Sequence, residues 1–178
     1  MKNFNPFYLI YIFLLFFSPS SFADIKTGYI DLDLILAKSI PSKILFSQLK
    51  INEEKELQNL KKKEIDLKDE EKNILSKKNI VSKEEYNKSV SSFKNKIDNY
   101  NNTKKIVIEN LKQIRNKEII RFFNLINPII EKIMEKNSIE ILLEKKNIYI
   151  AKSSYDITQI VIENINMEIK DYKIQDNE

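Results

Sequence analysis

Apolar residues in the middle of the chain recur in steps of four and three over about seven heptads. The stripe runs from residue 86 to residue 114, shifts by one residue, and resumes from residue 119 to residue 133. Its members are Tyr86, Val90, Phe93, Ile97, Tyr100, Lys104, Val107, Leu111, Ile114, Ile119, Phe122, Ile126, Ile129 and Ile133. Only Lys104 interrupts the apolar set. This spacing predicts one long coiled-coil helix, with a kink at Pro128.

A second helix is predicted over residues 44–76, which are highly charged and contain neither glycine nor proline. Apolar residues recur every seven positions from this segment into the next, at Leu60, Leu67, Ile74 and Val81. The partner positions between them are polar, namely Glu64, Glu71 and Lys78. Only one of the two seam positions of each heptad is therefore apolar, so half of a coiled-coil seam is present.

The reversal between the two helices is predicted at residues 77–81. Ser82 stands three residues before Glu85 and just before the long stripe, which is the pattern of a capping box. The second helix should therefore begin at Lys83. It would be on the order of 65 Å long, whereas a compact chain of this size has a radius of gyration of about 15 Å. The two helices are expected to form an antiparallel hairpin that projects from the rest of the protein.

A strand is predicted before the hairpin. Residues 28–34 alternate between apolar and polar side chains, with Ile30, Leu32 and Leu34 on one side, and they include the only glycine of the chain. A short helical stretch should follow and be interrupted by Pro41.

Two further strands are predicted after the hairpin, at residues 139–144 and 147–151, joined by a short hairpin-like connection. Asp156 and Gln159 resemble a second capping box, which would open an amphipathic closing helix. The polar tail from Asp171 is expected to fray. The strands on both sides should form one small body that roots the hairpin. The residues expected in the core of this body and of an oligomer are Ile30, Leu32, Leu34, Ile141, Leu143, Ile148 and Ile150.

The first 23 residues have the pattern of a signal peptide. Residues 7–17 are an unbroken apolar run, too short for the roughly 20 residues that cross a bilayer. The small residues Ser21 and Ala23 then suit a signal peptidase, so cleavage after Ala23 is predicted. The protein is therefore expected to be exported, and an uncleaved anchor is the alternative.

The composition argues against an enzyme. The chain has no histidine, no cysteine and one glycine. Histidine or thiol catalysis, the common zinc sites and glycine-rich phosphate loops are therefore excluded. Carboxylates are plentiful, but their pattern is that of a solvated helix face. No cofactor and no metal ion are expected.

The charge is unevenly distributed along the chain. Residues 45–80 carry 9 lysines and 8 acids, and residues 83–121 carry 10 basic and 5 acidic residues. The rest of the chain after residue 23 carries 10 basic and 13 acidic residues. Basic arms would attract acidic polypeptides or an anionic lipid surface, and ordinary solubility is the other explanation. Nucleic-acid binding is not expected.

Several apolar residues of the second helix lie off its stripe, namely Ile106, Ile108, Ile120 and Phe123. A two-helix seam does not cover them, so another chain, a bound client or the body must. They are the candidate client-facing residues of the arm.

These features together resemble the Skp/OmpH family of periplasmic chaperones. The resemblance rests on TGYIDLDLIL at residues 27–36, on the reversal SKKNIVSKEEY at residues 76–86 and on the closing segment at residues 139–166, which contains Asp156-Ile157-Thr158. The arms of this chain hold less glycine and alanine than is usual in the family. The resemblance implies a homotrimer whose helical arms hang from a β body and hold unfolded outer-membrane proteins without ATP.

The expected fold class is therefore α+β and mostly helical, with a long hairpin projecting from a small β body that is expected to be trimeric. The expected divisions are a signal peptide (1–23), an N-terminal strand and short helix (24–43), the arm (44–135), C-terminal strands and helix (136–170) and a polar tail (171–178). The expected function is that of an ATP-independent periplasmic holdase for unfolded outer-membrane proteins. An exported coiled-coil adaptor of the cell envelope is the alternative.

Overall fold

The computed structural model describes residues 25–174, so the predicted signal peptide and its cleavage site at Ala23 lie outside the described residues. In chain order the elements are β1 (Thr27–Ile30), α2 (Leu32–Lys38), α3 (Ile40–Ser76), α4 (Lys83–Lys136), β2 (Ile141–Glu144) and α5 (Thr158–Glu168). Two short 3-10 turns, η1 (Lys145–Asn147) and η2 (Ser153–Tyr155), lie between β2 and α5.

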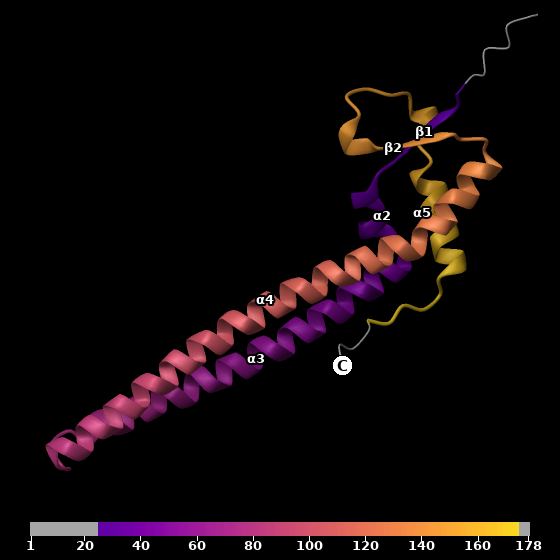
Figure 1. Cartoon of the computed structure of the whole chain (residues 1–178). Coiled ribbons are helices and arrows are strands. Elements are labelled where there is room, and N and C mark those ends of the chain that lie inside the picture. Colours follow the sequence, from indigo (N-terminus) through magenta and orange to yellow (C-terminus); the bar gives the residue numbers. More distant parts are fainter. Residues whose placement is uncertain (1–24, 175–178) are drawn as a thin grey trace, which may run out of the picture.

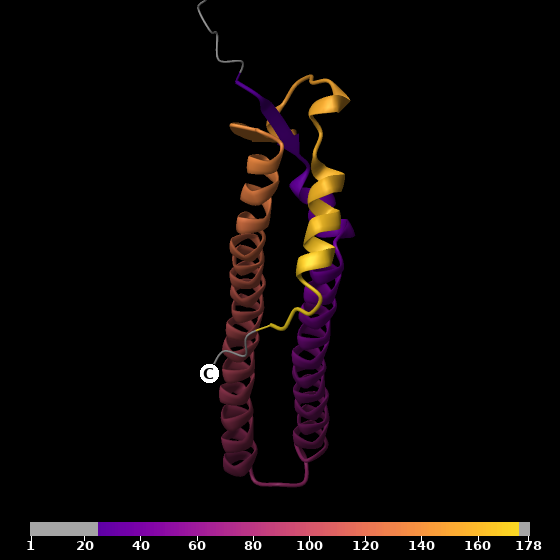
Figure 2. The same cartoon turned by 90° about the vertical axis from the view of Figure 1, so that its right-hand side faces the viewer.

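Helices α3 and α4 run side by side in opposite directions and project far beyond a small body (Figures 1 and 2). The predicted hairpin is confirmed, and so is the start of its second helix. Ser82 is the N-cap of α4, and its hydroxyl accepts a hydrogen bond from the backbone N–H of Glu85 at 3.2 Å. With 54 residues, α4 is about 80 Å long.

Proline acts differently from the prediction at one end of the hairpin. Pro41 does not interrupt a helix but stands in the first turn of α3, where its missing N–H costs no hydrogen bond. As a result α3 begins at Ile40 rather than near residue 44. Helix α4 contains Pro128 and continues to Lys136.

The body is built around a two-stranded sheet in which β1 pairs with β2 in parallel. The register places Gly28 opposite Leu142 and Ile30 opposite Glu144. Helix α4 leads directly into β2, so the strand after the hairpin lies beside the strand before it. Gly28 lies close to Ile139, because a Cβ atom at this position would be 3.2 Å from Ile139 Cδ1. The single glycine therefore allows the two ends of the hairpin to meet closely.

The first strand is shorter than predicted and ends at Ile30. Asp31 caps a helix, because its carboxylate accepts a hydrogen bond from the N–H of Leu34 at 2.9 Å. Leu32 and Leu34 therefore belong to α2 rather than to a strand. The helical turn buries Ile35 completely and leaves Leu34 at the surface.

The predicted strand at residues 147–151 is wrong, as is its hairpin connection. The chain forms η1 directly after β2, and the N–H of Ile148 closes this turn on the carbonyl of Lys145. The side chain of Lys145 then reaches back to Asp31 at 2.9 Å. This turn directs the following segment away from the sheet, and the side chains of Tyr149 and Ile150 are almost wholly exposed.

A chain of hydrogen bonds joins the end of β1 to the start of α5. The N–H of Asp31 donates to the hydroxyl of Thr158 at 2.9 Å, and that hydroxyl donates to the carboxylate of Asp156. The N–H of Ile157 donates to the carbonyl of Tyr29 at 3.0 Å. The predicted capping box is wrong, because the N-cap of α5 is Ile157, which makes no side-chain hydrogen bond. Asp156 accepts from the N–H of Thr158, and Gln159 bonds to Glu163.

The hydrophobic core lies where the root of the hairpin meets α2 and α5. Its fully buried apolar side chains are Ile35, Leu45, Phe122, Ile126, Val161 and Ile165. The segment that was expected to fray also contributes, because Tyr172 is 2 % exposed. Residues 171–174 are therefore packed against the protein as far as the structure describes them.

Candidate functional site

The seam of the arm follows a slightly different line from the predicted stripe. Ser89 and Thr103 are half-buried, whereas the predicted members Val90 and Lys104 are exposed. Further along, the seam continues through Glu118, which is 1 % exposed, and the neighbouring Ile119 is half-buried. Steps of four from residue 114 through residues 118 and 122 replace the predicted one-residue shift. Polar side chains thus occupy three positions of the seam.

The first arm helix also brings polar groups to the seam. Glu70, rather than the predicted Glu71, is half-buried there, and it accepts from the ammonium group of Lys96 on α4 at 2.7 and 2.9 Å. Glu64 is half-buried and bonds to Lys68 one turn away at 2.8 Å. The Lys68 hydrogen bond lowers the pKa of Glu64, and the same contact raises the pKa of Lys68. Of these two pairs, only Glu70–Lys96 joins the two helices, and because its groups are partly exposed to water it holds the distal arm together only weakly.

The predicted client-facing residues are mostly at the surface. Ile106, Ile108 and Ile120 are 60, 50 and 61 % exposed. Phe123 is half-buried and packs edge-on against Phe122, with the ring centroids 6.0 Å apart, so the body partly covers it. Ile106 and Ile108 flank a shallow depression that is also lined by Lys105, Glu109 and Asn110.

The first arm helix carries exposed apolar side chains that the sequence analysis missed. Ile51, Leu57 and Ile65 are 63, 45 and 50 % exposed. The signal of Ile51 and Ile65 was present in the sequence, since neither fits the heptad positions of Leu60 and Leu67 or their partner positions. Leu57 lies one heptad before the partner position Glu64. Both arm helices therefore present aliphatic groups to the surroundings.

One groove collects several of these groups near the root of the arm. It encloses about 270 Å³ between α3 and α4. Its apolar lining consists of Leu49, Leu57, Ile108, Leu111 and Ile114. Its polar rim consists of Asn52, Glu53, Lys112 and Arg115. The guanidinium group of Arg115 lies 5.5 Å from the centre of the Phe46 ring, which fixes one end of the rim by a cation–π contact.

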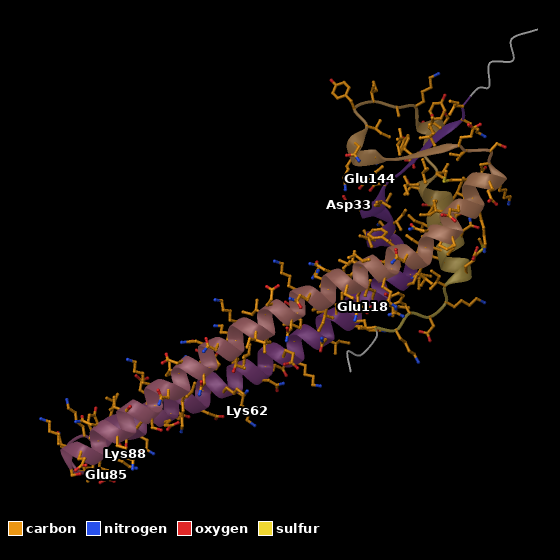
Figure 3. The ribbon with its side chains drawn as sticks, in the orientation of Figure 1. Asp33, Lys62, Glu85, Lys88, Glu118 and Glu144 are labelled. Atoms are coloured by element: carbon orange, nitrogen blue, oxygen red, sulfur yellow. The ribbon has the colours of Figure 1, made fainter. Side chains whose placement is uncertain are left out.

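The arm is lined with charge along its length. Figure 3 shows side chains extending outward from both helices, with Lys62 along α3 and Lys88 near the tip. Residues 83–121 carry a net charge of +5, whereas residues 45–80 carry +1. The basic character is therefore concentrated on α4, on the same helix as Ile106, Ile108 and Ile120.

The body presents a second apolar surface. Of the seven residues predicted for its core, only Ile30 is buried within one chain, and Leu32 and Ile148 are half-buried. Leu34, Ile141, Leu143 and Ile150 are 37, 45, 46 and 84 % exposed. Ile141 and Leu143 are two residues apart on β2 and therefore point to the same side of the sheet. A single chain leaves this side uncovered.

At the root of the arm, the C-terminal segment contributes a buried polar contact (Figure 3 labels Glu118). The hydroxyl of Tyr172 donates to the carboxylate of Glu118 at 2.9 Å, and Arg121 lies 3.1 Å from the same oxygen. Burial raises the pKa of Tyr172 to about 12, and the hydrogen bond to Glu118 adds to this shift. Neither residue was singled out in the sequence, because they are 54 positions apart.

Among residues 25–174, no cluster of acidic side chains has the arrangement of a metal site. Within the same residues, no helix combines the length and the apolar composition needed to cross a bilayer.

The described residues thus form a long helical hairpin rooted in a small parallel sheet, with apolar groups exposed along the arm. The family described as outer membrane protein (OmpH-like) matches residues 26–165, and the chain belongs to this family. The family is one of chaperones and is not enzymatic.

The fold is also that of a solved structure. An OmpH-like protein from Caulobacter crescentus CB15, proposed to be an outer membrane chaperone, superposes with a TM-score of 0.76 at 17 % sequence identity. The match covers 81 % of this chain and 85 % of the Caulobacter chain. The search of curated proteins gave no match. The mostly helical α+β fold expected from the sequence is confirmed.

Proposed function

We propose that this chain is an ATP-independent holdase of the periplasm that binds unfolded outer-membrane proteins along its helical arms. The observation that carries the proposal is the row of exposed aliphatic side chains on a projecting, basic arm, of which Ile106 and Ile108 are examples. Each such group contributes on the order of 1 kcal/mol when a client covers it, at about 25 cal/mol per Å². Many weak contacts hold an unfolded chain while each of them stays exchangeable. Release then requires only a more stable destination for the client.

We also propose that the protein acts as a homotrimer. This proposal is supported by the uncovered side of β2, where Ile141 and Leu143 are nearly half exposed, and by the exposed Tyr149 and Ile150 that follow. Packing of three bodies would cover these residues and place three arms around one cavity. Sedimentation of residues 24–178 should give a mass of three chains that stays constant on dilution. A stable monomer would contradict the trimer proposal, because the arm of one chain cannot enclose a cavity.

The holdase proposal is tested by light scattering. A denatured β-barrel protein is diluted into buffer with and without an equimolar amount of trimer, and suppressed scattering is expected. The groove variant Leu57→Ser with Ile108→Ser should suppress scattering less than the wild type. Met167→Ser is the matched control, because Met167 is 62 % exposed but lies on α5 in the body. Equal scattering with and without the wild-type trimer would leave the adaptor function as the better explanation.

A further inference from the structure

The chain continues beyond α5 in a segment that we call the C-terminal strap, residues 169–174. Helix α5 ends at Glu168, and the strap then crosses the hairpin from α3 toward α4 (Figure 2). The family match ends at residue 165, so the strap lies outside the matched residues.

The backbone of the strap is held by one side chain from each arm helix. On α3, the amide of Gln48 donates to the carbonyl of Tyr172 at 2.8 Å and accepts from the N–H of Ile174 at 2.8 Å. On α4, the guanidinium group of Arg121 donates to the carbonyl of Lys173 at 2.8 Å. Three consecutive residues are thereby fixed across both helices.

The side chain of Tyr172 anchors the strap. Its ring packs edge-on against Phe122, with the centroids 6.0 Å apart, and the guanidinium group of Arg121 lies 5.2 Å from the centre of the ring. Its hydroxyl donates to the carboxylate of Glu118. Glu118 and Tyr172 are 1 and 2 % exposed, so the contact is closed to water.

The position of the strap coincides with the end of the packed core. On the body side of Glu118, the seam of α4 is filled by fully or nearly fully buried residues such as Phe122 and Ile126. On the tip side, burial nearly stops. Leu60 of α3 is the only buried residue between residues 50 and 117. The strap therefore crosses the hairpin where the arm leaves the support of the body.

The strap also distinguishes the two flat faces of the hairpin. With 3.6 residues per helical turn, Gln48 of α3 and Arg121 of α4 lie on one side of the seam between the helices. Phe46 and Arg115 lie on the opposite side. The strap covers the first face at the root. The groove lined by Leu57 and Ile108 opens on the second face and stays uncovered.

We propose that the strap is a brace that sets the direction and stiffness of the arm relative to the body, with Tyr172 and Gln48 as its positioning residues. Because the arm is long, a small change of angle at the root moves the tip a large distance. The brace therefore fixes where the arm tip lies relative to the body. This proposal does not depend on whether the protein acts as a holdase.

Distance measurements between two spin labels test the proposal directly. The chain contains no cysteine, so Asn79→Cys at the tip and Ser154→Cys in the body give two defined sites in the full chain. Labelled chains are diluted with an excess of unlabelled chains, so that distances within one chain are measured. Tyr172→Ala and Gln48→Ala are each expected to broaden the distance distribution roughly twofold, because the root is freed to move. Lys173→Ala is the matched control, since its exposed side chain is removed while its carbonyl stays in place.

The same samples separate a brace from a segment that only adds stability. Circular dichroism and thermal unfolding are recorded for each variant. A lower midpoint with an unchanged distance distribution in both variants would overturn the proposal. If Tyr172→Ala does not fold, Gln48→Ala decides the outcome, because it removes two hydrogen bonds and leaves the core intact. A broadened distribution for Gln48→Ala with a wild-type distribution for Lys173→Ala supports the brace.

Discussion

The hydroxyl of Tyr172 lies 2.9 Å from Oε2 of Glu118, and both residues are closed to water. A carboxylate in a coiled-coil seam is costly unless hydrogen bonds compensate for its lost hydration. Here a residue of the C-terminal strap and Arg121 of the same helix supply those bonds. The contact explains why a charged residue can continue the seam of α4, and it ties the end of the chain to the root of the arm.

Tyr172→Phe is expected to lower the free energy of unfolding by about 1–2 kcal/mol, because it removes the hydroxyl donor but keeps the ring packed against Phe122. Urea unfolding followed by circular dichroism measures the change. Tyr155→Phe is the control, since Tyr155 is 43 % exposed and lies outside the residues proposed for the trimer contact, so its hydroxyl should contribute little. Equal losses for the two variants would contradict the role of the buried hydrogen bond.

The raised pKa of Tyr172 predicts a loss of stability in alkaline solution. The pKa of Tyr172 is about 12 in the folded protein, against 10.0 for an ordinary tyrosine. The folded state therefore holds its proton more tightly, and the stabilisation is complete below pH 10 and is lost as the pH rises toward 12. Other tyrosines and lysines titrate in the same window, so the comparison is with Tyr172→Phe. The wild type should lose its stability advantage over this variant between these two pH values, and a constant difference would count against the assignment.

Thr158→Val should weaken the body. The substitution keeps the shape of the side chain but leaves the N–H of Asp31 and the carboxylate of Asp156 without a shared partner. Loss of buried hydrogen bonds of this kind costs about 1–3 kcal/mol. Thr158→Ser retains the hydroxyl and should restore most of the stability in the same urea titration. A Ser variant as unstable as the Val variant would show that packing of the methyl group matters instead.

Basic groups beside the groove should strengthen the binding of acidic clients. Lys112→Glu with Arg115→Glu reverses two charges on the groove rim and is expected to weaken binding of an acidic unfolded protein several-fold at about 0.05 M salt. Fluorescence anisotropy with a labelled client measures the effect, and the difference should shrink at about 0.5 M salt, where charges are screened. Lys152→Glu, in an exposed part of the body, is the control. An effect of the same size in the control would point to net charge rather than to the groove.

The hairpin was predictable because its signals are local. Ser82 and Glu85 fix the start of α4, and heptad spacing fixes the helical period. The strand at residues 147–151 was predicted wrongly, because Tyr149 and Ile150 have strand-like side chains but find no partner strand within one chain. The helical capping by Asp31 competes with the strand pattern of Leu32 and Leu34, and the cap prevails.

The polar seam positions could not be predicted from the spacing of apolar residues. From the sequence, Glu118 would be predicted at the surface. It is buried because Tyr172, 54 positions further along the chain, donates a hydrogen bond to it. The client-facing residues Ile106, Ile108 and Ile120 were identified correctly as lying off the seam, although their role in binding stays a prediction. The missed groups Ile51 and Ile65 on α3 were equally visible, since they also fall outside the heptad positions.

The parallel pairing of β1 with β2 has a consequence for the order in which the molecule is assembled. More than a hundred residues separate the two strands, and both arm helices lie between them. In a chain synthesised from its amino end, β1 exists long before its partner strand does, so sheet closure must follow completion of the arm. Such distant pairing slows folding. A truncated chain that ends before residue 141 therefore lacks β2 and cannot form the sheet at the root of the arm. Only a chain that includes β2 can anchor its arm in the body.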